Sequence, residues 1–195
     1  MGTLGKHLRA KFMKKTWDKV VLIGFRGAGK TTVGKLLAEK LNLPFLDLDE
    51  EVQRRVGLSI KEMVERFGWS YFREREREVL SELIEKEGCV AALGGGSVLH
   101  DDLMEKLKCK AFIIYLKISP ATAVERISKD SKSEQTRPSL LEVSLAEEVE
   151  RVLKERSPLY EKHADIIIEA DRKELNTIFK EILKHLEVRH GSNHT

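Results

Sequence analysis

Residues 24–31 read GFRGAGKT, a glycine-rich loop that matches the pattern G-x-x-x-x-G-K-[ST]. The apolar run VVLI at 20–23 precedes the loop, and the helical pattern VGKLLAEKL at 33–41 follows it. A buried strand that enters a glycine turn and then a helix N-terminus points several backbone N–H groups at one spot, where the helix dipole also favours negative charge. The stretch therefore predicts a site for the phosphates of a nucleotide; the alternative is an ordinary glycine turn.

The residue types within this loop suit phosphate chemistry. Gly24, Gly27 and Gly29 let the backbone wrap closely around a ligand. We expect the Lys30 ammonium to bridge the β- and γ-phosphates and the Thr31 hydroxyl to ligate Mg²⁺.

Five short apolar runs along the chain predict strands: VVLI at 20–23, FL at 45–46, CVAAL at 89–93, AFIIYL at 111–116 and DIII at 165–168. Their apolarity is continuous rather than alternating, which is typical of strands buried on both faces. Helical patterns lie between them, so the sequence predicts an α/β sandwich whose parallel sheet is covered by helices.

Polar and glycine residues follow several of these strands. Asp47 and Asp49 come after the second run, and the glycines at 94–96 come after the third. Because ligands of such folds gather at the carboxyl ends of the strands, we expect these residues to share one crevice with the phosphate loop. For the two aspartates alone, a helix N-cap is an equal interpretation, since further acidic residues follow them.

The stretch 72–84 carries a carboxylate on the apolar side of a predicted helix. At about 100° per residue, that side is defined by Phe72, Val79, Leu80, Leu83 and Ile84. Glu76 lies in the middle of this face and Arg73 at its edge, so we expect the two to form an ion pair. The pair is either structural or a device that holds a guanidinium ready to bind a carboxylate or phosphate of a substrate.

The composition suits one soluble domain with a substantial core. The chain has 195 residues, of which 41% are hydrophobic and 34% charged. No apolar stretch approaches the about 18 residues that a membrane-spanning helix needs, so we expect a cytoplasmic protein that binds no membrane. Cys89 and Cys109 show no metal or redox spacing, and we expect two reduced thiols near the core.

We expect a basic arm at 1–18, a single domain at 19–187 and a polar tail at 188–195. The net charge is only +3, and the arm lacks the apolar segment of a signal peptide. We interpret the arm as a disordered or over-extended start, with translation beginning at Met13, rather than as a contact for nucleic acid.

Two segments interrupt the regular alternation of strands and helices. Residues 57–88 add two helices, more than a simple crossover requires, and we expect them to form a substrate-binding insert. Residues 128–144 are polar, aperiodic and contain a proline, which predicts an exposed lid.

The sequence resembles the shikimate kinase family over nearly the whole chain. The resemblance lies in the loop GFRGAGKTT, the D-x-D at 47–49, Phe72-Arg73, the glycines of LGGGSV, Arg137-Pro138, and RSPLY with Arg156. These motifs occur in the family's order and near its spacings.

The resemblance implies a three-layer α/β sandwich with a five-stranded parallel sheet, a P-loop kinase fold with a lid and a substrate-binding insert. It implies transfer of the γ-phosphoryl group of ATP to the 3-hydroxyl of shikimate, with Mg²⁺ as cofactor. We expect the protein to be a monomer. The ATP-binding residues that it implies are Gly27, Ala28, Gly29, Lys30, Thr31, Thr32, Arg137 and, by a looser match, Arg172. The shikimate-binding residues are Asp49, Arg73, Gly95 and Arg156.

The residues themselves fit those roles. Phosphoryl transfer needs alignment and charge neutralisation, which Lys30, Mg²⁺ and a mobile Arg137 supply. Asp49 is suited to orient the attacking hydroxyl. Alternatives remain for two arginines. Arg156 precedes Ser157-Pro158, where a helix should end or kink, so the alternative to substrate binding is an exposed cation in the last turn of that helix. Arg172 is otherwise a solvated side chain.

One position departs from the family pattern. The family's Gly-Glu-x-x-Phe-Arg is here Gly68-Trp69-Ser70-Tyr71-Phe72-Arg73. We expect the Trp69 indole to stack on Arg73; the alternative is that it fills the core.

Two other functions compete with this one. The first is a kinase for another small polar metabolite, such as gluconate or a nucleoside monophosphate. The second is a nucleotide-binding module without turnover. Arg73, Arg156 and the glycines at 94–96 argue against the first. The intact Lys30, Thr31, Asp49 and Arg137 argue against the second, which only Trp69 supports.

Overall fold

The computed structural model describes residues 17–129 and 144–188. Residues 1–16 of the expected arm, residues 130–143 of the expected lid with Arg137, and residues 189–195 of the expected tail lie outside this part of the chain. Among the described residues no helix is long and apolar enough to cross a membrane.

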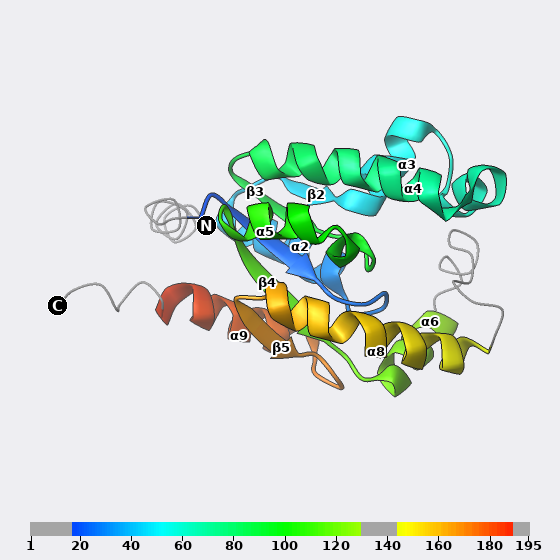
Figure 1. Ribbon diagram of the computed structural model, residues 1–195. Coiled ribbons are helices and arrows are strands. Elements are labelled where there is room, and N and C mark those ends of the chain that lie inside the picture. The colour runs from blue at the N-terminus through cyan, green and yellow to red at the C-terminus, as the bar shows by residue number, and fades with distance from the viewer. Residues whose placement is uncertain (1–16, 130–143, 189–195) are drawn as a thin grey trace.

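A five-stranded parallel sheet forms the centre of the molecule, in the order β2-β3-β1-β4-β5 (Figure 1). The strands are β1 (Lys19–Ile23), β2 (Phe45–Asp47), β3 (Cys89–Ala92), β4 (Ala111–Lys117) and β5 (Ile166–Glu169). All five apolar runs of the sequence therefore form strands. The first lies in the middle of the sheet, where the loop after it is flanked by β3 and β4.

Helices cover both faces of this sheet. In chain order the helical elements are α2 (Lys30–Leu41), α3 (Leu48–Val56), α4 (Ile60–Glu85), the 3₁₀ turn η1 (Ser97–Leu99), α5 (Asp101–Lys108), α6 (Pro120–Lys129), α8 (Leu145–His163) and α9 (Leu175–Val188). With the sheet between them they form the expected three-layer α/β sandwich (Figure 1).

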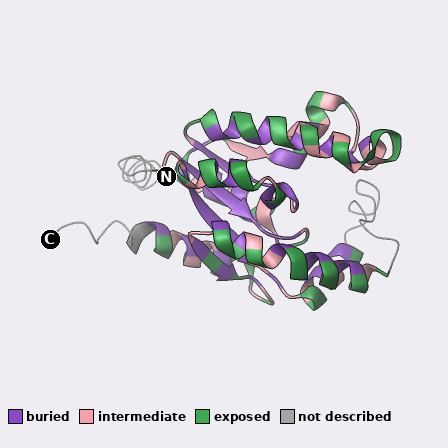
Figure 2. Ribbon diagram, viewed as in Figure 1, coloured by how far each residue is buried: buried purple, intermediate pink, exposed green. Residues whose placement is uncertain are grey.

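Alternate residues of β1 belong to two separate cores. Val20 and Leu22 pack with side chains of α2 and α9 on one face, whereas Val21 and Ile23 pack with α4 and α5 on the other. All four are at most 1% exposed. Figure 2 shows buried strands between helices whose outer faces are exposed. Strands buried on both faces favour apolar residues along their whole length, which explains the continuous runs of β1, β3 and β4. For the edge strand β5 the expectation of burial on both faces was wrong, since its residues alternate between buried and exposed.

Helix α4 contains the break that the sequence predicted between two helices of the insert. Gly68 has φ 82° and ψ 169°, values outside the helical region, so the helical residues before and after it form two segments. A positive φ of this kind favours glycine. The second segment carries the predicted apolar face, with Glu76 buried in it.

Two local expectations were wrong. The expectation of a helix end or kink near Ser157 was wrong as to the end: helix α8 runs through Pro158 to His163, and the residues on both sides of the proline, Arg156 and Tyr160, are buried. Cys109 is exposed, since it caps the end of α5 before β4 begins; Cys89 is buried, and both thiols are free.

Candidate active site

The phosphate loop joins β1 to α2 at the carboxyl end of the central strand. Gly29 has a left-handed conformation, with φ 89° and ψ 16°, and it is the N-cap of α2. The Lys30 ammonium donates to the carbonyl oxygens of Gly24 at 2.8 Å and Phe25 at 2.9 Å. The lysine is thus folded over its own loop, above a helix N-terminus that favours anions.

Thr31 and Asp47 connect the phosphate loop with the strand β2. The Thr31 hydroxyl donates to Asp47 Oδ2 at 2.6 Å, while Asp47 Oδ1 accepts from the backbone N–H of Asp49 at 3.1 Å. Asp47 is therefore both an N-cap of α3 and a neighbour of the loop, so its two interpretations are compatible. A hydroxyl beside a carboxylate is a set of oxygen donors that fits Mg²⁺.

Arg73 and Glu76 form the ion pair that the helical pattern predicted. Arg73 Nη1 lies 2.5 Å from Glu76 Oε2, and the glutamate side chain is fully buried. Burial acts to raise the pKa of Glu76, but a hydrogen bond from His100, the charge of Arg73 and a hydrogen bond from Ser97 together lower it below its ordinary value. The carboxylate is therefore ionised and holds the guanidinium.

The glycine turn after β3 lets these charged groups approach the backbone. A Cβ atom at Gly94 would overlap the Asp49 carboxylate, and one at Gly96 would overlap the Arg73 guanidinium. Any larger residue at either position displaces one of these side chains. The turn therefore explains why the chain has glycines here.

Arg156 reaches the same turn from α8. Its Nη1 donates to the Gly95 carbonyl oxygen at 3.2 Å, and the Tyr160 hydroxyl donates to the same oxygen at 2.5 Å. Arg156 is 7% exposed, and its Nε is buried without a hydrogen-bond partner. The interpretation of Arg156 as an exposed cation was therefore wrong.

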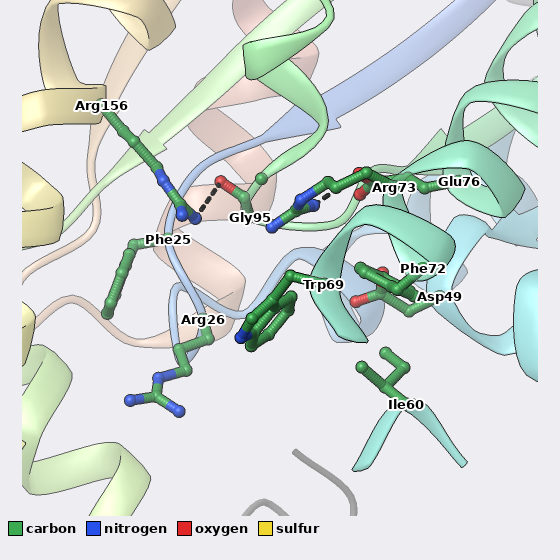
Figure 3. Close-up of a pocket in the computed structure, with 11 residues that line it drawn as sticks. Phe25, Arg26, Asp49, Ile60, Trp69, Phe72, Arg73, Glu76, Gly95 and Arg156 are labelled. Carbon is green, nitrogen blue, oxygen red and sulfur yellow. Dashed lines mark hydrogen bonds and ion pairs between the residues drawn. The ribbon is translucent and has the colours of Figure 1, made fainter. Parts of the chain in front are cut away.

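A pocket that is open to solvent brings these residues together (Figure 3). Its lining consists of Phe25, Arg26, Asp49, Ile60, Trp69, Phe72, Arg73, Glu76, Gly95, Gly96 and Arg156. Arg73 and Arg156 enter from α4 and α8, and Asp49 lies at the side of α3. Three guanidinium groups, two carboxylates and three aromatic rings line the pocket, a set that suits a small anionic molecule with hydroxyl groups.

Trp69 lies between the aromatic and the cationic parts of this pocket. The Arg73 Cζ atom is 5.5 Å from the centroid of the indole, within cation–π distance. The indole also meets the Phe72 ring edge-on, with centroids 6.0 Å apart. The expected contact of the indole with Arg73 is therefore present, although the same Cζ atom lies nearer to the Phe72 ring, at 5.1 Å. The alternative packing of the indole against the core is present as well.

Arg172, which the resemblance assigned to the nucleotide, and Arg126 of α6 have different surroundings. Arg172 is an exposed residue of the turn before α9, with φ 51°. Arg126 instead contacts the loop, because it donates to the carbonyl oxygens of Gly27 and Ala170, both at 3.0 Å.

Sequence reasoning missed several lining residues, above all Arg26. Its guanidinium forms an ion pair with Glu148 of α8 at 2.5 Å, and Glu148 is almost fully buried. The partners are 122 positions apart, so no local pattern indicates the pair. The only available signal was the place of Arg26 inside the phosphate loop.

A separate cluster of Asp101, Glu105 and His163 is the one group in the described ranges with ligand atoms close enough to hold a metal ion. The Lys162 ammonium already lies 2.6 Å from Asp101 and 3.1 Å from Glu105. The two carboxylates are therefore neutralised by a cation from the protein itself.

Comparison with known proteins agrees with this geometry. The family model "Shikimate kinase" matches residues 26–187. The shikimate kinase of Syntrophus aciditrophicus (strain SB) is 40% identical over 176 residues, covering 86% of this chain and 90% of that protein.

Solved structures give the same result. A shikimate kinase from Acinetobacter baumannii in complex with shikimate superposes with a TM-score of 0.83 at 32% identity, covering 92% of this chain and 98% of that one. The shikimate kinase of Aquifex aeolicus vf5 has a TM-score of 0.74 at 42% identity, covering 88% and 97%. The chain belongs to the shikimate kinase family.

Proposed function

We propose that this protein transfers the γ-phosphoryl group of ATP to the 3-hydroxyl of shikimate, forming shikimate 3-phosphate and ADP. The observation that carries the proposal is the pocket beside the phosphate loop, which Arg73 and Arg156 line from two different helices. Membership of the shikimate kinase family supports the same substrate.

The two arginines are the proposed site for the carboxylate of shikimate. Arg156 is 7% exposed and has a buried Nε without a hydrogen-bond partner, so it has a donor available for a ligand. Arg73 is oriented by Glu76 and by the Trp69 ring. Planar guanidinium groups match a planar carboxylate with paired hydrogen bonds, which a nucleoside or an uncharged sugar cannot offer.

Asp49 is the proposed partner of the attacking hydroxyl. It is 6% exposed, lines the pocket and lies beside Gly94 at the floor of the glycine turn. A carboxylate there accepts a hydrogen bond from the hydroxyl and orients it toward the phosphate, and it is a suitable acceptor for the proton. Gly95 contributes backbone to the same binding site.

The nucleotide is proposed to bind at residues 27–32, with Lys30 exchanging its two loop carbonyls for phosphate oxygens. Thr31 is the proposed Mg²⁺ ligand, with Asp47 beside it. Bound Mg²⁺ neutralises charge on the phosphates.

The remaining assignments follow the family resemblance. We propose that Arg137 contacts the transferring phosphate from a lid at 128–144, that Arg172 contributes to the nucleotide site, and that residues 57–88 form the substrate-binding insert. The proposed form is a cytoplasmic monomer that acts on small molecules.

The test is identification of the product. The purified protein is incubated with ATP, Mg²⁺ and shikimate, and the product is examined by phosphorus–proton correlation NMR. We expect a phosphate ester at the 3-position, formed together with one ADP. An ester at another hydroxyl, or no ester with shikimate, contradicts the proposal.

A further inference from the structure

The segment from the glycine turn to the start of α5 connects the two helices that carry the pocket arginines. His100 Nε2 lies 3.1 Å from Glu76 Oε2 on α4. The next residue, Asp101, accepts from Lys162 Nζ at 2.6 Å and lies 2.9 Å from His163 Nε2, both on α8. Two adjacent residues thus tie α4 and α8 to one short segment.

We propose that His100 is a positioning residue for substrate binding, which acts through Glu76 on Arg73. The inference rests on the proposed function, since it takes Arg73 as a ligand of the shikimate carboxylate. His100 itself lies outside the lining of the pocket. Its effect on substrate is therefore indirect.

The geometry around Glu76 explains how His100 acts. Glu76 Oε2 lies 2.5 Å from Arg73 Nη1 and 3.1 Å from His100 Nε2, whereas Oε1 accepts from Ser97 at 2.8 Å. The terminal torsion of a glutamate is broad, so its carboxylate plane is fixed only by such partners. His100 and Ser97 hold one oxygen each, and this fixes the plane on which the guanidinium aligns.

Loss of the His100 contact changes two things for Arg73. The carboxylate gains freedom to rotate, and of the two groups that contact Oε2 the Arg73 guanidinium alone remains. A buried carboxylate with fewer donors attracts the remaining cation more strongly. Arg73 is then both less well oriented and less available to a ligand, so affinity for a carboxylate substrate falls.

Two amide variants distinguish the hydrogen bond from His100 to Glu76 from the effect of side-chain size at position 100. Glutamine at position 100 keeps an N–H donor on a side chain of similar reach, whereas asparagine places it one methylene shorter. We expect His100→Gln to leave the shikimate KM within about twofold and His100→Asn to raise it about fivefold, the loss of part of a hydrogen bond to a charged group. The kcat and the ATP KM should not change.

The matched control is Asp102→Asn. Asp102 binds Arg77 and so also joins α5 to α4, but it does not touch Glu76. We expect its shikimate KM to match that of the unaltered protein. Should His100→Asn not fold, as judged by its thermal unfolding, His100→Ser makes the same comparison with a side chain too short to reach Glu76.

A double variant tests the route through Arg73. In an Arg73→Ala background we expect His100→Asn to cause no further rise in the shikimate KM. Two results overturn the inference without affecting the kinase activity. In the first, His100→Asn raises the shikimate KM as much in the Arg73→Ala background as in the unaltered protein. In the second, His100→Asn and the unaltered protein have equal shikimate KM values. An unaltered protein that does not phosphorylate shikimate overturns the proposed function, and this inference with it.

Discussion

Arg73 and Arg156 meet the same glycine turn from two different helices, and each is held there by a different kind of partner. The Arg73 guanidinium packs beside Gly96 and pairs with the buried carboxylate of Glu76. Arg156 donates to the carbonyl oxygen of Gly95. Because neither is fixed by the other, the separation of the two guanidinium groups depends on how α4 and α8 pack against the turn.

This arrangement predicts that removing either arginine weakens the binding of shikimate much more than that of its amide. We expect Arg73→Ala or Arg156→Ala to weaken shikimate binding by about 2 to 5 kcal/mol, through loss of a buried charge-assisted pair. Shikimate amide lacks the charged group, so its already weak binding should change far less. The measurement is KM for both compounds, with Arg75→Ala as a control, since Arg75 lies on the same helix but pairs with Glu78 at the surface. Equal losses for acid and amide would refute the clamp.

The phosphate loop predicts a loss of turnover. We expect Lys30→Ala to lower kcat about 100-fold or more, because it removes a preorganised contact to the transferring phosphate. Steady-state kinetics with saturating ATP measures this, and Lys35→Ala, an exposed lysine of the same helix, is the control. A Lys30→Ala variant with kcat close to that of Lys35→Ala argues against this role.

The stacking of Trp69 on Arg73 predicts an optical signal. The chain has two tryptophans, so a Trp17→Phe background leaves Trp69 as the only one. Titration with shikimate should change its emission to a saturating level, and the change should disappear in Arg73→Ala. A cation–π contact is worth about 0.5 to 2 kcal/mol, so Trp69→Ala should raise the shikimate KM by a corresponding factor. If the fluorescence does not change on addition of shikimate and the shikimate KM of Trp69→Ala equals that of the unaltered protein, Trp69 only fills the core.

The lowered pKa of Glu76 predicts how stability depends on acid. The Glu76 carboxyl loses its proton more readily in the folded protein than in the unfolded chain. The ionised carboxylate therefore contributes fully to the free energy of unfolding above the ordinary glutamate pKa of about 4.3. This contribution is lost as the pH falls through the lower pKa of the folded state. Glu76→Gln should therefore be less stable than the unaltered protein at pH 7, and the difference should shrink toward pH 3.

Urea unfolding at several pH values measures this difference. The control is Glu78→Gln, an exposed carboxylate of the same helix that pairs with Arg75 at the surface. Its effect should be small throughout, since exposed pairs contribute little. A Glu76→Gln difference that stays constant or widens toward acid contradicts the prediction.

Much of the fold could be predicted from local patterns. The continuous apolar runs predicted all five strands. In β1, β3 and β4 these residues are buried on both faces, whereas the edge strand β5 alternates buried and exposed residues, with Ile167 43% exposed. The helical spacing of Phe72, Glu76 and Val79 was enough to predict a buried carboxylate and its pairing with Arg73. Local rules failed at Pro158, where tertiary packing kept α8 continuous.

The remainder of the site depends on contacts between distant residues. His100 has no ligand-like spacing in the sequence, and its partner Glu76 is 24 positions away. Arg26 and Glu148 are separated still further. Such contacts arise only when β3, α4 and α8 converge on the phosphate loop. A resemblance to a family identifies the residues of its motifs, but it does not reveal which distant side chains contact them.

The most direct test of the account is a coupled assay of ADP release with a panel of acceptors. Shikimate, gluconate and several nucleoside monophosphates are each offered with ATP and Mg²⁺ at equal concentrations. We predict ADP release with shikimate far above the rate without acceptor, and no increase with the others. Gluconate also has a carboxylate and hydroxyl groups, but on an open chain, whereas the ring of shikimate holds the carboxylate for Arg73 and Arg156 and the 3-hydroxyl for Asp49 at a fixed separation. Turnover of gluconate or a nucleotide while shikimate stays inert would contradict the account.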